Sequence, residues 1–294
     1  MTSDALRTMA APASPRPRDE ELDLFGLTHV GRVRKENHDH FLLCTVHPQV
    51  VVHGTSLPGP ERLPLRGQRV ATVMLVADGV GSTAGGGEAS QLATEAITRY
   101  VTSSLSCYHA AGGEASDEEF LSALRAAAFD AHTTVLAEAA TRVVPIRMAT
   151  TLTLAIVTWP WVHVVQVGDS RCYVYQGGQL RQVTRDQTMA QALVDEGALP
   201  RESLSTSPLS HVLVSAIGGE AARPEVTRLN IRDRGSVLLL CSDGLTKHVS
   251  DPELAERIGA MTSSEQLCRD LLDLVLDRGG SDNITILAGR APMR

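Results

Sequence analysis

Residues 149–178 read ATTLTLAIVTWPWVHVVQVGDSRCYVYQGG, and this stretch decides the fold class. Apolar and β-branched residues dominate it, and short turn-forming groups interrupt it, which is typical of strands joined by tight turns. The pattern predicts strands over 151–157, 162–167 and 171–175. Three strands therefore follow one another without a helix between them.

Outward from this stretch, groups of strands alternate with pairs of helices. Apolar residues at three-four spacing predict the helices. Further strands are expected over 22–27, 40–46, 70–77, 226–231, 236–241 and 284–288, and helices over 88–105, 118–140, 251–258 and 264–276. A doubly wound parallel sheet needs one helix after each strand, so this order excludes it. It favours an α+β fold with two sheets packed face to face and flanked by helices.

The 294 residues predict one domain over 22–291, preceded by a disordered tail. Residues 1–21 are rich in Ala, Pro and Arg and lack the apolar segment of a secretory signal. Residues 48–68 hold four prolines and three glycines, which predicts an irregular insertion. Residues 187–218 predict a helical, partly irregular flap.

Composition excludes several classes of partner. The net charge of −7 and the aromatic content of 3% disfavour nucleic acids and anionic membranes. No apolar run approaches the ~18 residues of a membrane span. The five cysteines form no CxxC pair, so we expect reduced thiols in a cytoplasmic protein.

Three aspartates share one sequence setting. Each lies beside an apolar strand and next to a glycine or another turn-former, in VADG (76–79), CSDG (241–244) and GSDN (280–283). A carboxylate at the end of a buried strand must be paired, capped or bound to a metal. Oxygen ligands alone suit the hard ions Mg²⁺ and Mn²⁺. The residues leave two interpretations open: one shared metal site, or three separate turns.

A fourth polar cluster, GRVRKENHD (31–39), lies between two predicted strands. The planar guanidinium of Arg34 is suited to binding a phosphate through two parallel hydrogen bonds. Taken alone, this segment also fits a solvated basic turn.

In this order, the motifs resemble the metal-dependent protein phosphatases of the PPM (type 2C) family, and a bacterial member in particular. The resemblance runs from about residue 26 to residue 289. Its segments are VGRVRKENHD, VADGVGSTAGGGEAS, MATTLTLAIV, VGDSRCYVYQGGQLRQVTRDQT, LVDEGAL, LLLCSDGLTKHVSD and GGSDNITIL. It implies a four-layer α-β-β-α sandwich of two packed antiparallel sheets with helices on both outer faces.

The resemblance also implies a metal site. Asp78 looks like the carboxylate that bridges two ions, and the carbonyl of Gly79 would complete the second. Asp243 and Asp282 would hold the first ion. The ions would be Mg²⁺ or Mn²⁺.

The remaining motif residues receive roles by the same resemblance. Arg34 looks like the phosphate-binding arginine, and Asp39 would act through metal-bound water and orient Arg34. Asn283, Asp169 and Arg171 match positions that support the site.

The implied reaction is hydrolysis of phosphoserine and phosphothreonine in proteins. A metal-bound water would attack phosphorus, without a phosphoenzyme. No cysteine lies in a phosphate-loop pattern, which argues against a thiolate mechanism. The implied partners are phosphoproteins, with a Hanks-type kinase and its targets as natural counterparts, and neither nucleic acid nor a membrane.

Three positions depart from the family pattern. Ile146 and Lys247 stand where relatives carry aspartates for a third, weaker metal site, so we expect that site to be absent. His38 replaces Glu or Gln before the motif aspartate. It would contact metal-bound water, act as an acid for the leaving group, or be a surface histidine.

An alternative function remains open. A pseudophosphatase would keep the fold and bind phosphoprotein with little or no turnover. Retention of Asp78, Gly79, Asp243, Asp282 and Arg34 favours the enzyme.

Overall fold

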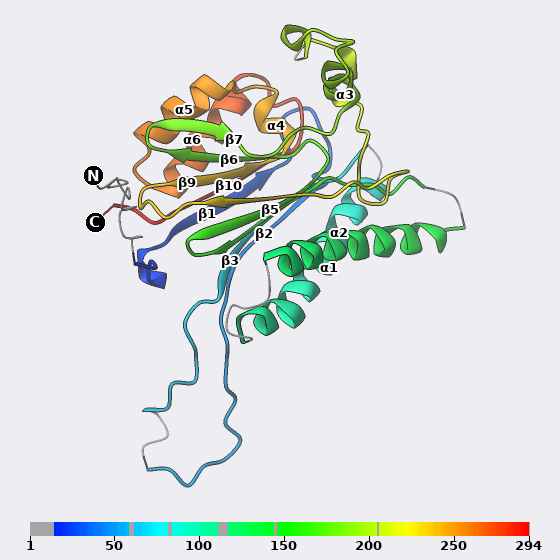
Figure 1. Cartoon of the computed structure of the whole chain (residues 1–294). Coiled ribbons are helices and arrows are strands. Elements are labelled where there is room, and N and C mark those ends of the chain that lie inside the picture. Colours follow the sequence, from blue (N-terminus) through cyan, green and yellow to red (C-terminus); the bar gives the residue numbers. More distant parts are fainter. Residues whose placement is uncertain are drawn as a thin grey trace, which may run out of the picture.

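A computed structural model of the chain describes residues 15–58, 62–81, 84–110, 117–143, 146–204 and 206–293. Within these residues, ten strands form two five-stranded antiparallel sheets that pack face to face (Figure 1). One sheet has the order β1-β10-β9-β6-β7 and the other β2-β3-β4-β5-β8. The strands are β1 (Asp23–His29), β2 (Asp39–Val46), β3 (Ala71–Asp78), β4 (Leu152–Thr158), β5 (Trp161–Val167), β6 (Arg171–Gln176), β7 (Gln179–Gln182), β8 (Glu225–Asn230), β9 (Val237–Cys241) and β10 (Ile284–Arg290).

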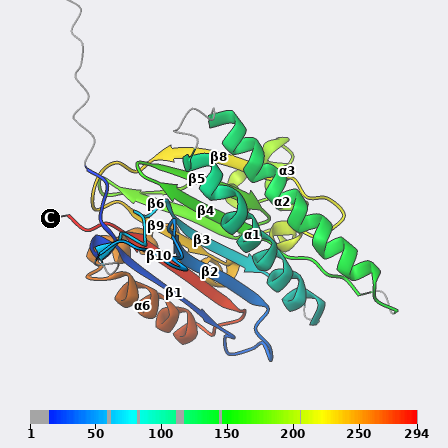
Figure 2. The ribbon, with the colours of Figure 1, turned by 90° about the horizontal axis from the view of Figure 1, so that it is seen from below.

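Helices cover both outer faces of this sandwich. Helices α1 (Ala84–Ala110) and α2 (Asp117–Ala140) lie on the β2–β8 sheet (Figure 2). Helices α5 (Asp251–Ala260) and α6 (Ser264–Asp277) lie on the other sheet (Figure 1). The predicted α+β class with four layers, α-β-β-α, is confirmed.

The central strands are apolar along their whole length because both of their faces are covered. Side chains on a strand alternate between the two faces of its sheet. Leu75 of β3 belongs to the core under α1 and α2, whereas its neighbour Val76 belongs to the core between the sheets. In the same way Leu239 of β9 packs under α5 and α6, and Leu240 faces the opposite sheet.

Some elements differ from the sequence prediction. The helix expected over 88–105 extends over Ala84–Ala110. Strand β7 was not predicted, because its four residues, QLRQ, are mostly polar and none is buried. The expected flap contains α3 (Met189–Asp195) and two short 3₁₀ turns, Arg201–Ser203 and Pro208–His211.

The insertion expected over 48–68 continues the β2–β3 hairpin as a long arm that projects from the sandwich (Figure 1). Residues 59–61 of it lie outside the described residues. Backbone hydrogen bonds of 2.8 Å join Val50 to Leu65 and Gly67 to Pro48 at its base. Beyond the base, Val51 is exposed.

Residues 1–14 of the predicted tail lie outside the described residues. The next residues pack against the sandwich. Asp19–Glu21 form a 3₁₀ turn, Arg69 donates to Asp19 at 2.5 Å and to the Pro17 carbonyl at 2.8 Å, and Arg16 donates to the Arg69 carbonyl. Among the helices that the structure describes, none is both long and apolar enough to cross a membrane.

The sheet register brings the sequence motifs to one end of the sandwich. Strand β2 begins at Asp39 and β3 ends at Asp78, and these two residues are direct partners in the antiparallel ladder. Strand β9 runs into Asp243, and β10 begins just after Asp282, beside it. Because neighbouring strands are antiparallel, all four aspartates therefore lie at the same end of the sandwich.

Candidate metal and phosphate site

Asp39 and Asp78 face one another across the β2–β3 ladder, and their charges oppose each other. Like charges directly opposite in a sheet are destabilising. Burial raises the pKa of Asp39 to about 6, with further contributions from Asp243 and Asp282. Burial, followed by the charge of Asp39, holds the pKa of Asp78 well above its usual range. If both carboxylates are ionised, they repel one another, and a cation beside them would offset that repulsion.

Hydroxyl groups from the opposite sheet fix Asp39. Ser242 and Thr285 each donate to its Oδ2 at 2.7 Å. Its Oδ1 is buried and has no hydrogen-bond partner among the described residues. An unpaired buried carboxylate oxygen is costly. It is therefore a position that a cation, or water held by one, would satisfy.

The backbone around Asp78 is held equally firmly. Thr151 Oγ1 accepts from the Asp78 N–H at 3.0 Å, and Thr150 Oγ1 donates to its carbonyl at 2.9 Å. A Cβ on Gly79 would lie 2.4 Å from the Gly86 carbonyl oxygen at the start of α1. Only glycine allows this approach, so the Gly79 backbone is fixed where the chain leaves β3.

Asp243 and Asp282 share one cation from the chain itself. Asp243 is the first residue of the short helix α4 (Asp243–Thr246), and Lys247 follows that helix. Lys247 Nζ lies 2.6 Å from Asp243 Oδ2 and 2.7 Å from Asp282 Oδ2. The sequence analysis found that Lys247 departs from the family pattern, but it did not predict that Lys247 contacts two aspartates.

Arg34 is the second cation of the site. It donates a hydrogen bond from Nη2 to Asp282 Oδ2 at 3.0 Å, and its Nε lies 2.7 Å from Asp282 Oδ1 as an ion pair. Burial alone would raise the pKa of Asp282, but the hydrogen bonds from Arg34 and Lys247 outweigh burial and leave the pKa below its usual value. The Asp39 carboxylate accepts from Ser242 and Thr285, whereas Arg34 contacts Asp282, so the orienting role of Asp39 toward Arg34 stays a prediction.

Asn283 joins the loop that carries Arg34 to the start of β10. Its side chain accepts from the His38 N–H and donates to the Val30 and Glu36 carbonyls, each at 2.9 Å. The predicted supporting position thus corresponds to a clamp on the backbone of residues 30–38.

We expect Asn283→Ala to lower the free energy of unfolding by about 2 kcal/mol, because it leaves three backbone groups without their partner. Urea denaturation measures the change. Asn230→Ala is the matched control, since that side chain accepts one exposed hydrogen bond, from the Arg232 N–H. Equal losses in the two variants would contradict the clamp.

His38 is only 8% exposed, so the interpretation as a surface histidine is wrong. Its Nδ1 is 3.1 Å from the Gly81 carbonyl and its Nε2 is 3.4 Å from a Glu36 carboxylate oxygen. The ring lies against α1, where a Cβ on Gly87 would be 3.2 Å from it. His38 therefore lies between the Arg34 loop and the start of α1.

Asp169 lies at the turn from β5 to β6 and is 8% exposed. Burial holds its pKa well above the usual range, and the charges of Asp243 and Asp186 add to the effect. Arg171 forms a two-pronged ion pair with Asp186, at 2.7–3.1 Å, beside this turn. Ile146 is exposed and supplies no carboxylate.

The structure brings together the aspartates that the sequence singled out. Within the described residues, no three His, Cys, Asp or Glu side chains already have the spacing of a bound ion. Instead, Lys247 and Arg34 hold Asp243 and Asp282. In the part of the chain that the structure describes, the site nevertheless has five aspartates and only two cationic side chains, and the Oδ1 atom of Asp39 has no hydrogen-bond partner. This set of oxygen donors fits hard divalent cations. The five are Asp39, Asp78, Asp169, Asp243 and Asp282.

Sequence reasoning missed Ser242 and Thr285. Both are small hydroxyl residues inside or next to otherwise apolar strand segments, LLLCS and ITIL, at the ends nearest the aspartates. A buried hydroxyl at such a position must find a hydrogen-bond partner. That requirement is the signal that could have marked these two residues, although it does not identify Asp39 as their partner.

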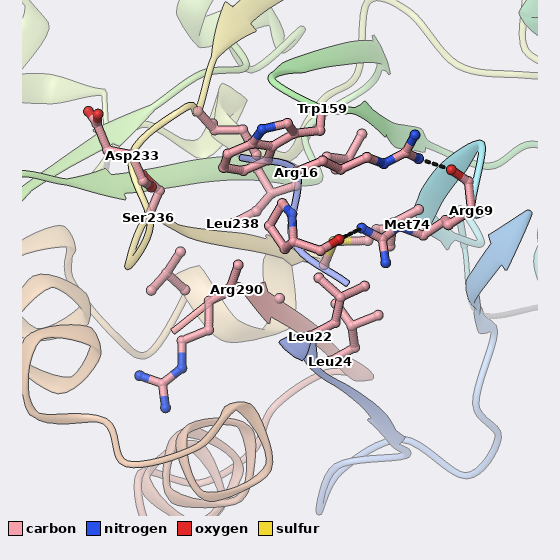
Figure 3. A pocket seen from close by; sticks show the side chains of 17 residues that line it. Arg16, Leu22, Leu24, Arg69, Met74, Trp159, Asp233, Ser236, Leu238 and Arg290 are labelled. Carbon is pink, nitrogen blue, oxygen red and sulfur yellow. Dashed lines mark hydrogen bonds between the residues drawn. The ribbon is translucent and has the colours of Figure 1, made fainter. Parts of the chain in front are cut away.

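A cavity lies at the opposite end of the strands (Figure 3). It is a cavity of about 50 Å³ lined by apolar residues, Trp159 among them, and by three arginines. Arg16 donates to the Arg69 carbonyl, Arg69 pairs with Asp19, and Arg290 pairs with Asp23. Its size falls far below the ~300 Å³ of a typical ligand pocket, so the aspartate end remains the candidate site.

The relatives found by comparison with known proteins include serine/threonine protein phosphatases. A family model described as protein phosphatase 2C matches residues 65–273. Serine/threonine protein phosphatase PstP of Mycobacterium tuberculosis is 33% identical over 217 residues, which is 74% of this chain and 40% of that protein. Serine/threonine phosphatase stp of Listeria monocytogenes is 29% identical over 215 residues, 73% of this chain and 82% of that protein.

A solved structure of the PstP catalytic domain, in complex with two manganese ions, superimposes with a TM-score of 0.70 at 27% identity. The match covers 92% of this chain and 99% of that one. The chain thus matches a complete catalytic domain, but less than half the length of the M. tuberculosis protein.

Proposed function

Because the chain belongs to the protein phosphatase 2C family, we propose that it hydrolyses phosphoserine and phosphothreonine in proteins, using two divalent cations held by Asp78, Gly79, Asp243 and Asp282. The observation that carries this proposal is the gathering of five aspartates at one end of the sandwich. The manganese complex of PstP supports the choice of cation, and Mg²⁺ suits the same oxygen ligands.

The chain's own residues have distinct tasks in this proposal. When bound, the cations supply Lewis acidity and lower the pKa of a water molecule. Asp78 is the ladder partner of Asp39; burial and the charge of Asp39 raise its pKa, and the charge of Asp243 also raises it, so Asp78 would serve both ions. Asp39 is fixed by Ser242 and Thr285 and presents its free Oδ1 to the site.

Arg34 would bind the phosphoryl oxygens. Its side chain is 40% exposed, and its guanidinium already contacts both oxygens of a carboxylate, an arrangement that a phosphate also offers. Asn283, His38 and Asp169 would keep the loop and the strand ends in position. No phosphoenzyme is needed.

The third metal site of the family is absent in this proposal. Ile146 supplies no ligand, and Lys247 brings a positive charge to the place of the second missing aspartate. A crystal structure in high Mn²⁺ tests this expectation. A third ion beside Lys247 would contradict it.

We further propose phosphoproteins as substrates, with a Hanks-type kinase as the counterpart that produces them, and a domain that extends over 22–291. The proposed compartment is the cytoplasm. Among the described residues, Cys172, Cys241 and Cys268 are buried and form no disulfide, as is usual where thiols are kept reduced.

Phosphate release from a phosphothreonine peptide, with and without Mn²⁺, tests the function. We expect turnover only with the metal, and a decrease of about a hundredfold or more in Asp243→Asn, since a group that stabilises charge at the reacting centre is lost. Asp273→Asn is the matched control, because Asp273 is an exposed aspartate of α6. Equal turnover in the wild type and Asp243→Asn would refute the assignment.

One observation favours the second candidate, a pseudophosphatase that binds phosphoprotein. Lys247 and Arg34 already hold two of the proposed metal ligands. A protein of this kind would bind the phosphothreonine peptide through Arg34 but release no phosphate at any Mg²⁺ or Mn²⁺ concentration. Peptide binding measured together with turnover distinguishes the two functions.

A further inference from the structure

Lys247 contacts both carboxylates that are proposed to hold the first ion. Its Nζ lies 2.6 Å from Asp243 Oδ2 and 2.7 Å from Asp282 Oδ2. The lysine side chain is 23% exposed and each aspartate side chain 18%, so water reaches the three groups only in part. Since Mg²⁺ lies about 2.1 Å from its ligands, an ion on these oxygens and the ammonium group exclude one another.

The choice of lysine at this position is unusual for this chain. The sequence has 27 lysines and arginines, but only Lys35 and Lys247 are lysines. A compact ammonium on a flexible stem fits between two carboxylates and can swing away from them. Arg34, by contrast, is a planar guanidinium that contacts Asp282 through two nitrogen atoms.

We propose that Lys247 is an internal competitor of the metal: its ammonium occupies the Asp243–Asp282 pair in the metal-free protein and must leave before an ion binds there. This inference rests on the proposed metal-dependent function and deepens it. Lys247 stabilises the metal-free site and weakens metal binding, so the metal concentration sets the fraction of protein that is loaded.

The physical reason is the balance of charge. Without an ion, the ammonium offsets the repulsion between Asp243 and Asp282. When a divalent cation takes these oxygens, two short ion pairs are lost, and the displaced ammonium still repels the ion from nearby. With a neutral side chain at position 247, metal binding no longer breaks two ion pairs, and no ammonium group repels the ion. The metal-free protein, however, loses the stabilisation that the ammonium gives to Asp243 and Asp282.

Calorimetric titration with Mn²⁺ tests the competition directly. Lys247→Met keeps the length of the side chain and removes the charge, whereas Lys247→Arg keeps the charge. We expect Lys247→Met to bind one Mn²⁺ at least about tenfold more tightly than the wild type, and Lys247→Arg to stay close to the wild type. The metal-free Tm of Lys247→Met should fall, and its rise on adding Mn²⁺ should exceed that of the wild type.

Amine acetylation of the wild-type protein tests the displacement. Lys35 is exposed and serves as the internal reference in the same sample. Saturation with Mn²⁺ should increase the acetylation of Lys247 relative to Lys35, measured by mass spectrometry of the two peptides. This readout requires no turnover.

The outcomes separate the two proposals. Unchanged Mn²⁺ affinity in Lys247→Met, or unchanged Lys247 acetylation in a wild type that binds Mn²⁺, would overturn the competition and leave the metal-dependent function standing. Failure of both the wild type and Lys247→Met to bind Mn²⁺ would overturn the metal-dependent function and the competition together. Tighter binding in Lys247→Met with greater acetylation in the wild type would support both.

Discussion

Asp78→Asn is expected to lower turnover by at least about a thousandfold, the rate equivalent of ~4 kcal/mol of lost transition-state stabilisation. Asp78 lies opposite Asp39 and within reach of the charge of Asp243, so in the proposed function it serves both ions. Its replacement affects both metal positions, which is why the expected loss exceeds that for Asp243→Asn. Phosphate release from a phosphothreonine peptide over a range of Mn²⁺ concentrations measures it.

The same substitution should stabilise the metal-free protein. Burial and the charge of Asp39 raise the pKa of Asp78, so the folded state favours its protonated form. An acid with a raised folded-state pKa binds more protons folded than unfolded, and stability therefore falls as pH rises between its unfolded and folded pKa values. The pKa of Asp39, raised to about 6, acts in the same direction.

With EDTA present, we expect the free energy of unfolding of the wild type to fall as pH rises from about 4 towards 6, apart from the opposite contribution of Asp282. Asp78→Asn should make that fall shallower and should be more stable than the wild type at neutral pH by about 1 kcal/mol, the scale of one opposed charge pair. Urea denaturation at several pH values measures both. A variant less stable than the wild type at neutral pH would refute this account, and Asp273→Asn should change neither quantity.

Gly244→Ala is expected to destabilise the fold by about 3 kcal/mol or more, because the new methyl group meets rigid backbone rather than a side chain that can move. A Cβ on Gly244 would lie 1.9 Å from the Asn283 carbonyl oxygen and 2.9 Å from its carbonyl carbon. The clash would push the start of α4, which carries Asp243, away from the start of β10, which follows Asp282. Folding and metal binding should therefore be lost together.

Thermal and urea unfolding measure the loss. Gly54→Ala is the control, since a Cβ on Gly54 meets nothing within 4 Å. If Gly244→Ala were as stable as Gly54→Ala, α4 and β10 would have to be free to separate at this point, contrary to the close packing of these two segments.

The residues were sufficient to predict most of the strands, because apolar runs end at turn-formers. They left open whether the aspartates meet, and only the family resemblance implied that they do. Asp78 and Asp243 are marked in this way by the runs that precede them. Antiparallel pairing then leaves few ways to arrange the strand ends. The short strand β7 lacked such a signal, since QLRQ is polar and pairs only with its neighbour β6.

The contacts inside the site were less predictable, because they join residues far apart in the chain. Ser242 and Thr285 reach Asp39 across the gap between the two sheets, over 203 and 246 residues of sequence. The position of Lys247 between two aspartates depends on the direction in which α4 leaves β9. The His38 ring lies close to Gly87 of α1, a neighbour that the local sequence, rich in charged residues, does not reveal.

The two ends of the β2–β3 hairpin differ in how strongly their sequence is constrained. At one end, Asp39 and Asp78 must keep their register, because a slip by one residue would turn both side chains to the other face. At the other end the chain enters the projecting arm, roughly 25 Å away along strands that rise ~3.4 Å per residue. Because β2 and β3 pair along their whole length, we expect changes in the length or sequence of the arm to leave this register unchanged. The hairpin thus gives this chain a place where its sequence can change freely during evolution, or be exchanged by an engineer, while the chemistry at the far end stays the same.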